Sequence, residues 1–334
     1  MDAEPERIEY EEFDAAALMR DFPPRWYHPN KQQVYGIACP AGFAPQGRLG
    51  YSRWRAVLPP ARFDPHAAVA RTLARESPFD YEPLDAVPAA VEWHVNFADP
   101  ELFVAYGSGL LAQDEMQVAE HPVLGSLREA LVAQSRATVT VDDEGATPVL
   151  ITGAERRCRI ATDPDAALGR PAGLYGNQFA RGTPDTIRKA TARLDPPTVT
   201  HLIAMAAIPG GEGEYTPLEI AYTLSTAYSG FRAAVLESAR VFGARPVVVH
   251  TGFWGCGAFG GNRILMTLVQ ILAAQAAGVD TLVFHTLSGH GTRAWDQACA
   301  LVSGVLRPSP PPTTVALCER IATLGLTWGM SDGN

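Results

Sequence analysis

The pattern of apolar and polar positions predicts alternating strands and helices over most of the chain. A half-buried strand is predicted where apolar residues alternate with polar ones, at Val91, Trp93, Val95 and Phe97. The continuous apolar run over 199–208 is typical of a strand buried on both faces. A long helix is predicted from Pro217 to about Phe242. This alternation predicts an α/β fold in which a mixed sheet is sandwiched between helices.

The clearest unit of this pattern occupies residues 246–286. A β-branched run over 247–249 leads into a turn rich in glycine and aromatic residues. An apolar helical stretch over 263–277 follows, and a second apolar run over 282–284 ends the unit. The segment therefore predicts a strand, a turn, a helix and a second strand.

The turn has the composition of an anion-binding loop. Glycines leave backbone N–H groups accessible next to a helix start, where phosphate binds, and they stand at Gly255, Gly257, Gly260 and Gly261. Trp254 and Phe259 lie in the same turn, so a ligand with a flat or apolar part is expected beside the anion. A diphosphate flanked by a ribose fits this mixture. An ordinary glycine-rich connection remains the alternative.

A second candidate site lies where Gln113, Asp114 and Glu115 open a short helix that His121-Pro122 closes. Two adjacent carboxylates can serve acid–base chemistry. Acidic residues in a first helical turn are equally often caps or partners of the helix dipole. The residues alone leave both interpretations open.

Composition narrows the classes of function. The 334 residues are 47% hydrophobic, which is enough for a large core. The net charge of −9 argues against a direct nucleic-acid surface. The five cysteines are widely spaced and form no metal-ligand pair, so no metal and no cofactor is predicted. The acidic N-terminus does not resemble a signal peptide and no apolar helix is long enough to span a membrane, so a cytoplasmic protein is expected.

Two regions are predicted. Residues 1–90 are rich in Pro, Arg and aromatic residues and have little periodicity, so we expect an accessory region that wraps the core. Residues 91–334 carry the strands, helices and candidate sites of the main domain.

The residues from Thr251 to Gly261 read TGFWGCGAFGG. This stretch resembles the TGNWGCGAFGG signature of poly(ADP-ribose) glycohydrolases, a branch of the macrodomains, and departs from it only at Phe253. The segment after it, LVQILAAQAAGVDTLVF, is also similar to the family. The resemblance implies a macrodomain fold and hydrolysis of an ADP-ribosyl bond without a cofactor.

The resemblance extends upstream to VNFAD and QDEM, which are similar to the family's VDFAN and QEE. Carried over, it implies that Glu115 is the catalytic glutamate and that Asp114, in place of a second glutamate, orients the ribose. Asp99 stands where the family has a ribose-contacting Asn, and Tyr175 is a candidate to cap the ligand. The implied substrate-binding set is Asp99, Gln113, Tyr175, Phe253, Trp254, Gly255, Cys256, Gly257, Ala258, Phe259, Gly260 and Gly261.

Two departures from the family concern the ligand. Phe103-Val104-Ala105 replaces three consecutive glycines, so side chains are expected to narrow or reshape that part of the site. Thr286 stands where the family has an adenine-stacking Phe, which implies either weaker adenine affinity or stacking by another ring such as Phe284 or Phe259. The replaced glycines, together with Asp114 in place of glutamate, point away from long poly(ADP-ribose) chains and toward a mono-ADP-ribosylated protein or base or a free NAD-derived small molecule. Alternatives to hydrolysis are a non-catalytic ADP-ribose-binding macrodomain, a biosynthetic enzyme acting on an NAD-derived nucleotide, and a scaffold whose site has degenerated.

Overall fold

The computed structural model describes residues 4–60, 71–306 and 312–333. Its elements, in chain order, are β1 (Glu6–Asp14), α1 (Ala15–Asp21), α2 (Pro29–Ala38), β2 (Arg48–Arg55), β3 (Arg71–Arg75), β4 (Val91–Ala98), α3 (Gln113–Glu120), α4 (Val123–Ala133), β5 (Val141–Asp142), β6 (Gly145–Ala146), β7 (Val149–Ile160), a 3₁₀ turn (Phe179–Arg181), α5 (Pro184–Ala190), β8 (Thr191–Ala206), α6 (Pro217–Phe242), β9 (Val247–Gly252), α7 (Arg263–Ala277), β10 (Thr281–His285), α8 (Gly289–Leu306) and α9 (Thr314–Ala322).

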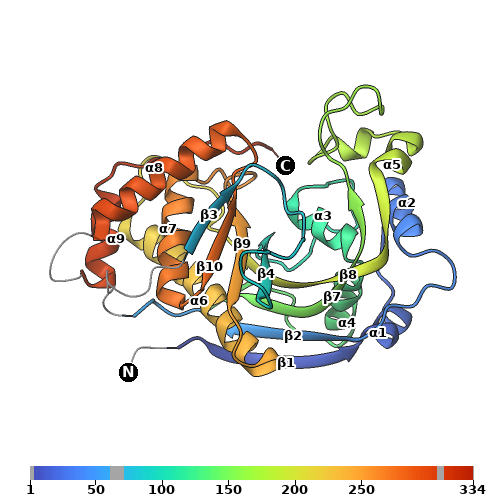
Figure 1. The fold of residues 1–334 in the computed structure, drawn as a ribbon, viewed down its shortest axis with the longest axis horizontal. Coiled ribbons are helices and arrows are strands. Elements are labelled where there is room, and N and C mark those ends of the chain that lie inside the picture. Colours follow the sequence, from blue (N-terminus) through green and yellow to red (C-terminus); the bar gives the residue numbers. More distant parts are fainter. Residues whose placement is uncertain (1–3, 61–70, 307–311, 334) are drawn as a thin grey trace.

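One mixed sheet organises the described part of the chain (Figure 1). Its strand order is β1-β2-β7-β8-β4-β9-β10-β3. Neighbours from β1 to β8 run antiparallel, and neighbours from β8 to β3 run parallel. The parallel half places the carboxyl ends of β8, β4, β9, β10 and β3 at one edge.

Helices cover both faces of this sheet, as the alternation of elements predicts. Trp93 and Val249 on one face share a core with α6, α7, α8 and α9. Leu202 and Ala204 on the opposite face share a core with α1, α3 and α4. A third cluster joins α2 and α5 to the far end of β7. The predicted α/β sandwich is therefore confirmed (Figure 1).

The predicted unit over residues 246–286 is β9, a turn, α7 and β10. The Asn262 side chain accepts hydrogen bonds from the N–H groups of Ile264 and Leu265, which fixes the start of α7. The end of α7 is Gly278, whose left-handed backbone (φ 74°) suits glycine. Local capping therefore agrees with the apolar periodicity at both ends of this helix.

The region before residue 91 does more than lie against the sheet. It contributes β1 and β2 to one edge of the sheet and β3 to the other. Residues 1–3 and 61–70 lie outside the described part. The domain boundary at residue 90 stays a prediction, and the accessory region that it delimits supplies both edges of the main sheet.

Three buried histidines lie side by side on β4, β9 and β10. The rings of His94 and His250 stack with centroids 4.4 Å apart, and His250 Nδ1 lies 3.2 Å from His285 Nε2. Glu92 accepts a hydrogen bond from His250 Nε2, and Phe79 covers the rings of His94 and His285. Neither ring nitrogen of His94 has a hydrogen-bond partner within the described residues. Burial, followed by the neighbouring histidines, holds the pKa of His94 well below 6.5.

Acid is therefore expected to weaken the fold through His94. The unfolded chain binds a proton at this ring below about pH 6.5 and the folded chain does not, so His94 lowers the free energy of unfolding as pH falls. Between pH 7 and pH 5 its contribution is about 2 kcal/mol. Buried carboxyls with raised pKa values act in the opposite sense, so the pH dependence of the wild type alone does not isolate His94. The free energy of unfolding in urea is therefore measured at both pH values for the wild type and for His94→Phe, and the two changes with pH are compared. Exposed His290→Gln is the control and keeps the wild-type dependence, and an identical dependence in His94→Phe would contradict the expectation.

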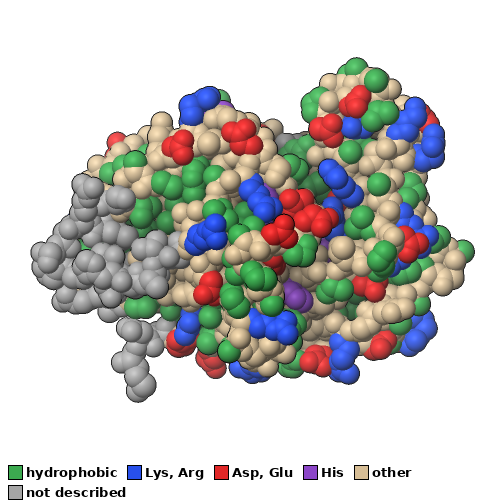
Figure 2. Space-filling view, in the orientation of Figure 1, with side chains coloured by type: hydrophobic (Ala, Val, Ile, Leu, Met, Phe, Trp, Pro, Cys, Tyr) green, Lys and Arg blue, Asp and Glu red, His purple; other side chains and the backbone are tan. Residues whose placement is uncertain are grey.

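No helix in the described ranges is both long and apolar enough to cross a membrane. On the face seen in Figure 2, acidic and basic side chains are interspersed over both halves of the molecule. This distribution agrees with the modest net charge of the chain.

Candidate functional site

The parallel strands bring three loops to the same edge of the sheet. The loop after β4 leads into α3, the loop after β8 leads into α6, and the glycine-rich turn after β9 leads into α7. In α/β sheets, ligands bind at this carboxyl edge. The topology therefore places the two sequence-predicted candidate sites next to each other.

Gln113 fixes α3 to β4. Its Oε1 accepts a hydrogen bond from Phe97 N at 2.8 Å, and its Nε2 donates to Val95 O at 3.0 Å. Both ends of the amide are thus held by the strand backbone. Gln113 was assigned to substrate binding from the sequence, and in the structure it positions the acids that follow it.

Asp114 is buried and faces β4. Its Oδ1 accepts a hydrogen bond from Asn96 Nδ2 at 3.0 Å, and the same amide donates to Gln117 Oε1 at 2.8 Å. Burial, and then the adjacent Glu115, raise the pKa of Asp114. Asp114 is therefore an oriented carboxyl group suited to hydrogen bonding.

Glu115 is 5% exposed at the start of α3. Its Oε2 accepts a hydrogen bond from Ala112 N at 3.0 Å, so the carboxylate caps the start of α3, while the Ala112 side chain has no group to return the bond. Burial raises the pKa of Glu115, opposed by backbone N–H groups and by Lys31. Such a carboxyl holds its proton at higher pH than a surface glutamate, as a general acid requires.

Asp99 lies at the end of β4 and is only partly buried. Its Oδ1 accepts a hydrogen bond from Glu101 N at 2.9 Å, which shapes the loop toward α3. Its charge raises the pKa of both Asp114 and Glu115. The three carboxyl groups therefore form one electrostatic cluster.

Lys31 is a component of this cluster that the sequence analysis missed. It lies on α2 of the N-terminal region, is fully buried, and donates from Nζ to Tyr106 O at 2.7 Å. Burial lowers its pKa to about 8, and the charges of Glu115 and Asp114 oppose that shift. One signal was present, because Lys31 and Lys189 are the only lysines among 27 basic residues.

The loop Phe103-Val104-Ala105, which the resemblance aligns with three glycines, has a left-handed backbone at Phe103, where φ is 55°. The Phe103 side chain is fully buried in the core shared with α3 and α4, whereas Val104 is exposed. The expectation that side chains here reshape the site therefore rests on Val104 and Ala105.

The glycine-rich turn is held partly by its own hydrogen bonds. Gly260 N donates to Gly257 O at 3.0 Å, and Gly261 N donates to Gly255 O at 2.8 Å. The N–H groups of Gly257, Ala258 and Phe259 have no hydrogen-bond partner in the described part of the chain. The N–H groups of Phe253 and Gly255 also have no partner there, so the turn offers several N–H groups to an anion.

Two glycines of the turn are required by packing. A side-chain carbon on Gly255 would lie 2.5 Å from Ala207 Cβ, and one on Gly261 would lie 2.7 Å from Gly255 O. The atoms nearest to an added side-chain carbon on Gly257 belong to Asp332, the closest at 3.2 Å, and Gly257 has no positive φ. A substitution at Gly257 therefore tests the side of the turn that faces Asp332 without straining the backbone.

The rings of the turn divide between core and surface. Trp254 is 1% exposed and donates from Nε1 to Met205 O at 2.9 Å, so it supports the turn from the core. Phe253 is buried against Phe284 in an edge contact. Cys256 and Phe259 are half-buried, and burial raises the pKa of the Cys256 thiol to about 12. Phe284 is fully buried, which leaves Phe259 as the available ring of the two considered for stacking.

Tyr175 lies close to the start of α3. Gly176 and Leu111 exchange backbone hydrogen bonds of 2.9 and 3.2 Å, which ties the Tyr175 loop to the loop before Ala112. Burial, and then the charge of Asp332, raise the pKa of the Tyr175 hydroxyl to about 12. Tyr175 is thus a neutral hydroxyl near the acids.

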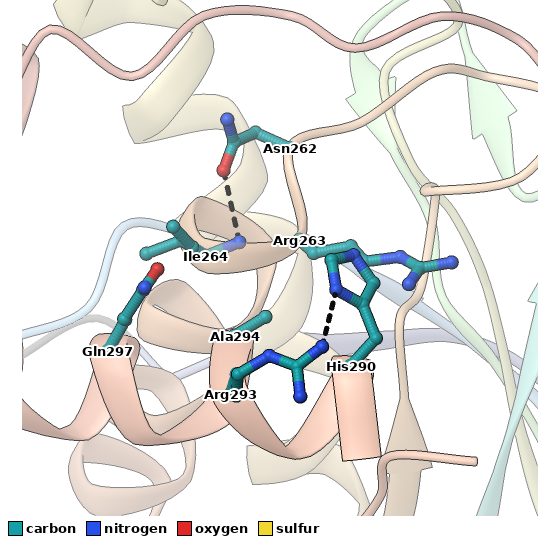
Figure 3. A pocket seen from close by; sticks show the side chains of 7 residues that line it. All are labelled: Asn262, Arg263, Ile264, His290, Arg293, Ala294 and Gln297. Atoms are coloured by element: carbon teal, nitrogen blue, oxygen red, sulfur yellow. Dashed lines mark hydrogen bonds between the residues drawn. The ribbon is translucent and has the colours of Figure 1, made fainter. Parts of the chain in front are cut away.

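A pocket of about 280 Å³ lies where α7 and α8 begin (Figure 3). Its walls are Asn262, Arg263, Ile264, His290, Arg293, Ala294 and Gln297. The guanidinium of Arg263 also lies over the ring of Phe253, 4.9 Å from its centroid. The pocket therefore adjoins the glycine-rich turn and is basic.

Among the described residues, no group of three or more His, Cys, Asp or Glu side chains is arranged to hold a metal ion. The chemistry available at the carboxyl edge is that of carboxyl groups, a tyrosine hydroxyl and backbone N–H groups.

Comparison with known proteins gives one family match. Residues 172–293 match the model described as poly(ADP-ribose) glycohydrolase, macro domain fold. The match includes Tyr175 and the glycine-rich turn. Asp99, Asp114 and Glu115 lie outside it, so their assigned roles remain predictions.

The chain also resembles solved structures of bacterial poly(ADP-ribose) glycohydrolases. The enzyme from Thermomonospora curvata is 17% identical, with 85% of this chain and 88% of that chain covered and a TM-score of 0.38. The same enzyme bound to the inhibitor ADP-HPD is 16% identical, with coverages of 85% and 87% and a TM-score of 0.42. The Deinococcus radiodurans enzyme in complex with ADP-ribose is 13% identical, with coverages of 90% and 96% and a TM-score of 0.39.

At these identities and TM-scores the likeness carries no conclusion about activity. The family match over residues 172–293 includes the motif that suggested the family from the sequence. The chain is therefore a divergent protein similar to poly(ADP-ribose) glycohydrolases of the macro domain fold.

Proposed function

We propose that the protein hydrolyses the glycosidic bond of an ADP-ribosyl group, with Glu115 as general acid and base. One observation carries the proposal. A buried carboxyl with a raised pKa begins α3 at the sheet edge that also carries the glycine-rich turn. An acid beside an anion-binding turn suits a glycosidic bond next to a diphosphate.

In the proposed complex the diphosphate binds the N–H groups of Gly257, Ala258 and Phe259. The base of the nucleotide extends toward the basic pocket of Figure 3, where Arg263 offers a planar group for stacking. The distal ribose faces Asp99 and Asp114. This arrangement directs the glycosidic bond toward Glu115.

The reaction follows from these positions. Glu115 donates its proton to the leaving oxygen as the bond from that oxygen to the ribose C1″ breaks through an oxocarbenium-like state. Water then attacks C1″, and the Glu115 carboxylate accepts the proton that the water loses. The products are ADP-ribose with a C1″ hydroxyl and the protonated leaving group. Asp114 orients a ribose hydroxyl, and Tyr175 covers the ligand.

A non-catalytic ADP-ribose-binding macrodomain is the second candidate. The bond from Ala112 N to Glu115 Oε2 supports it, since that bond gives Glu115 a purely structural use. Release of free ADP-ribose from a labelled ADP-ribosylated protein separates the two functions, because a binding domain leaves the label in place.

Ligand binding is tested by calorimetric titration with ADP-ribose. The wild type is expected to bind in the micromolar range. Gly257→Leu is expected to weaken binding at least about tenfold, because the new side chain fills the space beside the turn, next to Asp332, that the diphosphate needs. Gly36→Leu is the matched control, since Gly36 is exposed on α2 with nothing within 4 Å of an added side-chain carbon. Equal affinities for the wild type and Gly257→Leu would reject the turn as the diphosphate site.

A further inference from the structure

The segment Thr327–Gly333 lies across the glycine-rich turn. Gly329 N donates a hydrogen bond to Gly260 O at 2.8 Å, and Asp332 N donates to Gly257 O at 3.4 Å. Asn262 Nδ2 also donates to Thr327 O at 2.8 Å. The segment therefore follows the turn as far as the start of α7.

One end of the segment is anchored by Trp328. Its ring stacks on Tyr215 with centroids 4.2 Å apart and planes 21° from parallel. The backbone N–H of Trp328 donates to Gly213 O at 2.9 Å, and the ring fills the space beside Gly211, where a side-chain carbon would lie 2.1 Å from it. These contacts tie the segment to the loop after β8.

The other end reaches the Tyr175 loop. Asn177 Nδ2 donates to Gly333 O at 2.8 Å, and the charge of Asp332 acts on the Tyr175 hydroxyl. Between the two ends, Met330 is 93% exposed. The middle of the segment thus has little apolar packing, and moving it breaks a few hydrogen bonds without opening the core.

The carboxylate of Asp332 lies beside Gly257. A side-chain carbon on Gly257 would lie 3.2 Å from Asp332 Oδ2. The N–H group of Gly257 is also one of those in the turn that have no hydrogen-bond partner among the described residues. A resident negative charge at this position repels a diphosphate and occupies part of the same space.

We infer that the segment Thr327–Gly333 is an internal competitor of the ligand, with the Asp332 carboxylate occupying the place of a phosphate until the ligand displaces it. The inference rests on the proposed function, because it takes the turn as the diphosphate site. Every ligand must therefore displace the segment from the turn. A ligand that contacts both the turn and the neighbouring pocket offsets this free-energy cost more readily than a small anion does.

Two variants test the competitor. Asp332→Asn removes the charge and keeps the size of the side chain. Gly329→Pro removes the N–H that donates to Gly260 O and loosens the segment from the turn. Asp143→Asn is the matched control, an identical change at an exposed position. Each protein is titrated calorimetrically with inorganic pyrophosphate and with ADP-ribose.

Both test variants are expected to bind pyrophosphate and ADP-ribose about tenfold more tightly than the wild type, because each ligand must displace the same segment. Asp143→Asn is expected to match the wild type. Unchanged or weaker pyrophosphate binding in both test variants overturns the inference and leaves hydrolysis open. Tighter pyrophosphate binding in variants that release no ADP-ribose from a labelled substrate supports the competitor and rejects the hydrolase.

Discussion

Replacing Glu115 by Gln is expected to lower the rate of ADP-ribose release by about 10²–10⁴-fold, the usual contribution of a general acid or base. The amide has no proton to give to the leaving oxygen and no carboxylate to accept one from water. Binding of ADP-ribose is expected to change little, because the diphosphate is held by the turn. The rate is measured as free ADP-ribose released from a labelled substrate at saturating concentration.

Glu219 supplies an unusually close control. It accepts a hydrogen bond from Thr216 N at 2.7 Å at the start of α6, the same capping position that Glu115 occupies on α3. Glu219→Gln therefore reproduces the capping change away from the acid cluster. If Glu115→Gln loses no more activity than Glu219→Gln, Glu115 is a cap and the proposed mechanism is wrong.

Replacing Arg156 by Met is expected to lower the free energy of unfolding by about 3–5 kcal/mol. Arg156 Nε donates to Glu120 Oε2 at 2.8 Å, and both side chains are nearly inaccessible to water. The guanidinium also donates to Asp80 O and lies over the ring of Tyr81, 4.2 Å from its centroid. Without it, Ile160 N is the one donor left to the buried Glu120 carboxylate among the described residues.

Urea unfolding measures this change. The double variant Glu120→Met with Arg156→Met is expected to be more stable than Arg156→Met alone, because it leaves no unpaired buried charge. Arg188→Met is the surface control, since the side chains of Arg188 and its partner Asp185 are 63% and 57% exposed and such surface pairs contribute little to stability. A loss in Arg156→Met as small as that of Arg188→Met would show that the buried pair is not a major source of stability.

Much of the fold could be predicted because its signals are local. The apolar run of β9, the periodicity of α7 and the Thr216 cap of α6 each lie within a few residues of sequence. The placement of β1 and β3 at opposite edges depends on pairing with segments far along the chain. Such pairing leaves no periodic mark in short strands, so the N-terminal region was expected only to wrap the core.

The candidate site likewise contains parts that local sequence signals predict and parts that depend on segments far along the chain. The acids and the turn could be expected to meet, because each follows a parallel strand and such strands share their carboxyl edge. The approach of Lys31 to the acids could not be expected from a local pattern. Lys31 lies on α2, far along the chain from the acids, and Tyr106 O in a different loop accepts the hydrogen bond from its Nζ. The position of Asp332 beside the glycine-rich turn depends on the path of the segment Thr327–Gly333, which no local pattern specifies. Trp254 was assigned to ligand binding from its place in the turn, and in the structure it is buried in the core. Aromatic character alone does not tell which side of a turn a ring faces.

The backbone of Phe103 has a consequence for the stability of its loop. A glycine at this position would relieve a left-handed conformation, yet it would also remove a ring from a filled core and leave a void. The void costs more than the relief supplies, so the strained conformation persists because the ring that causes the strain also fills the core under α3 and α4.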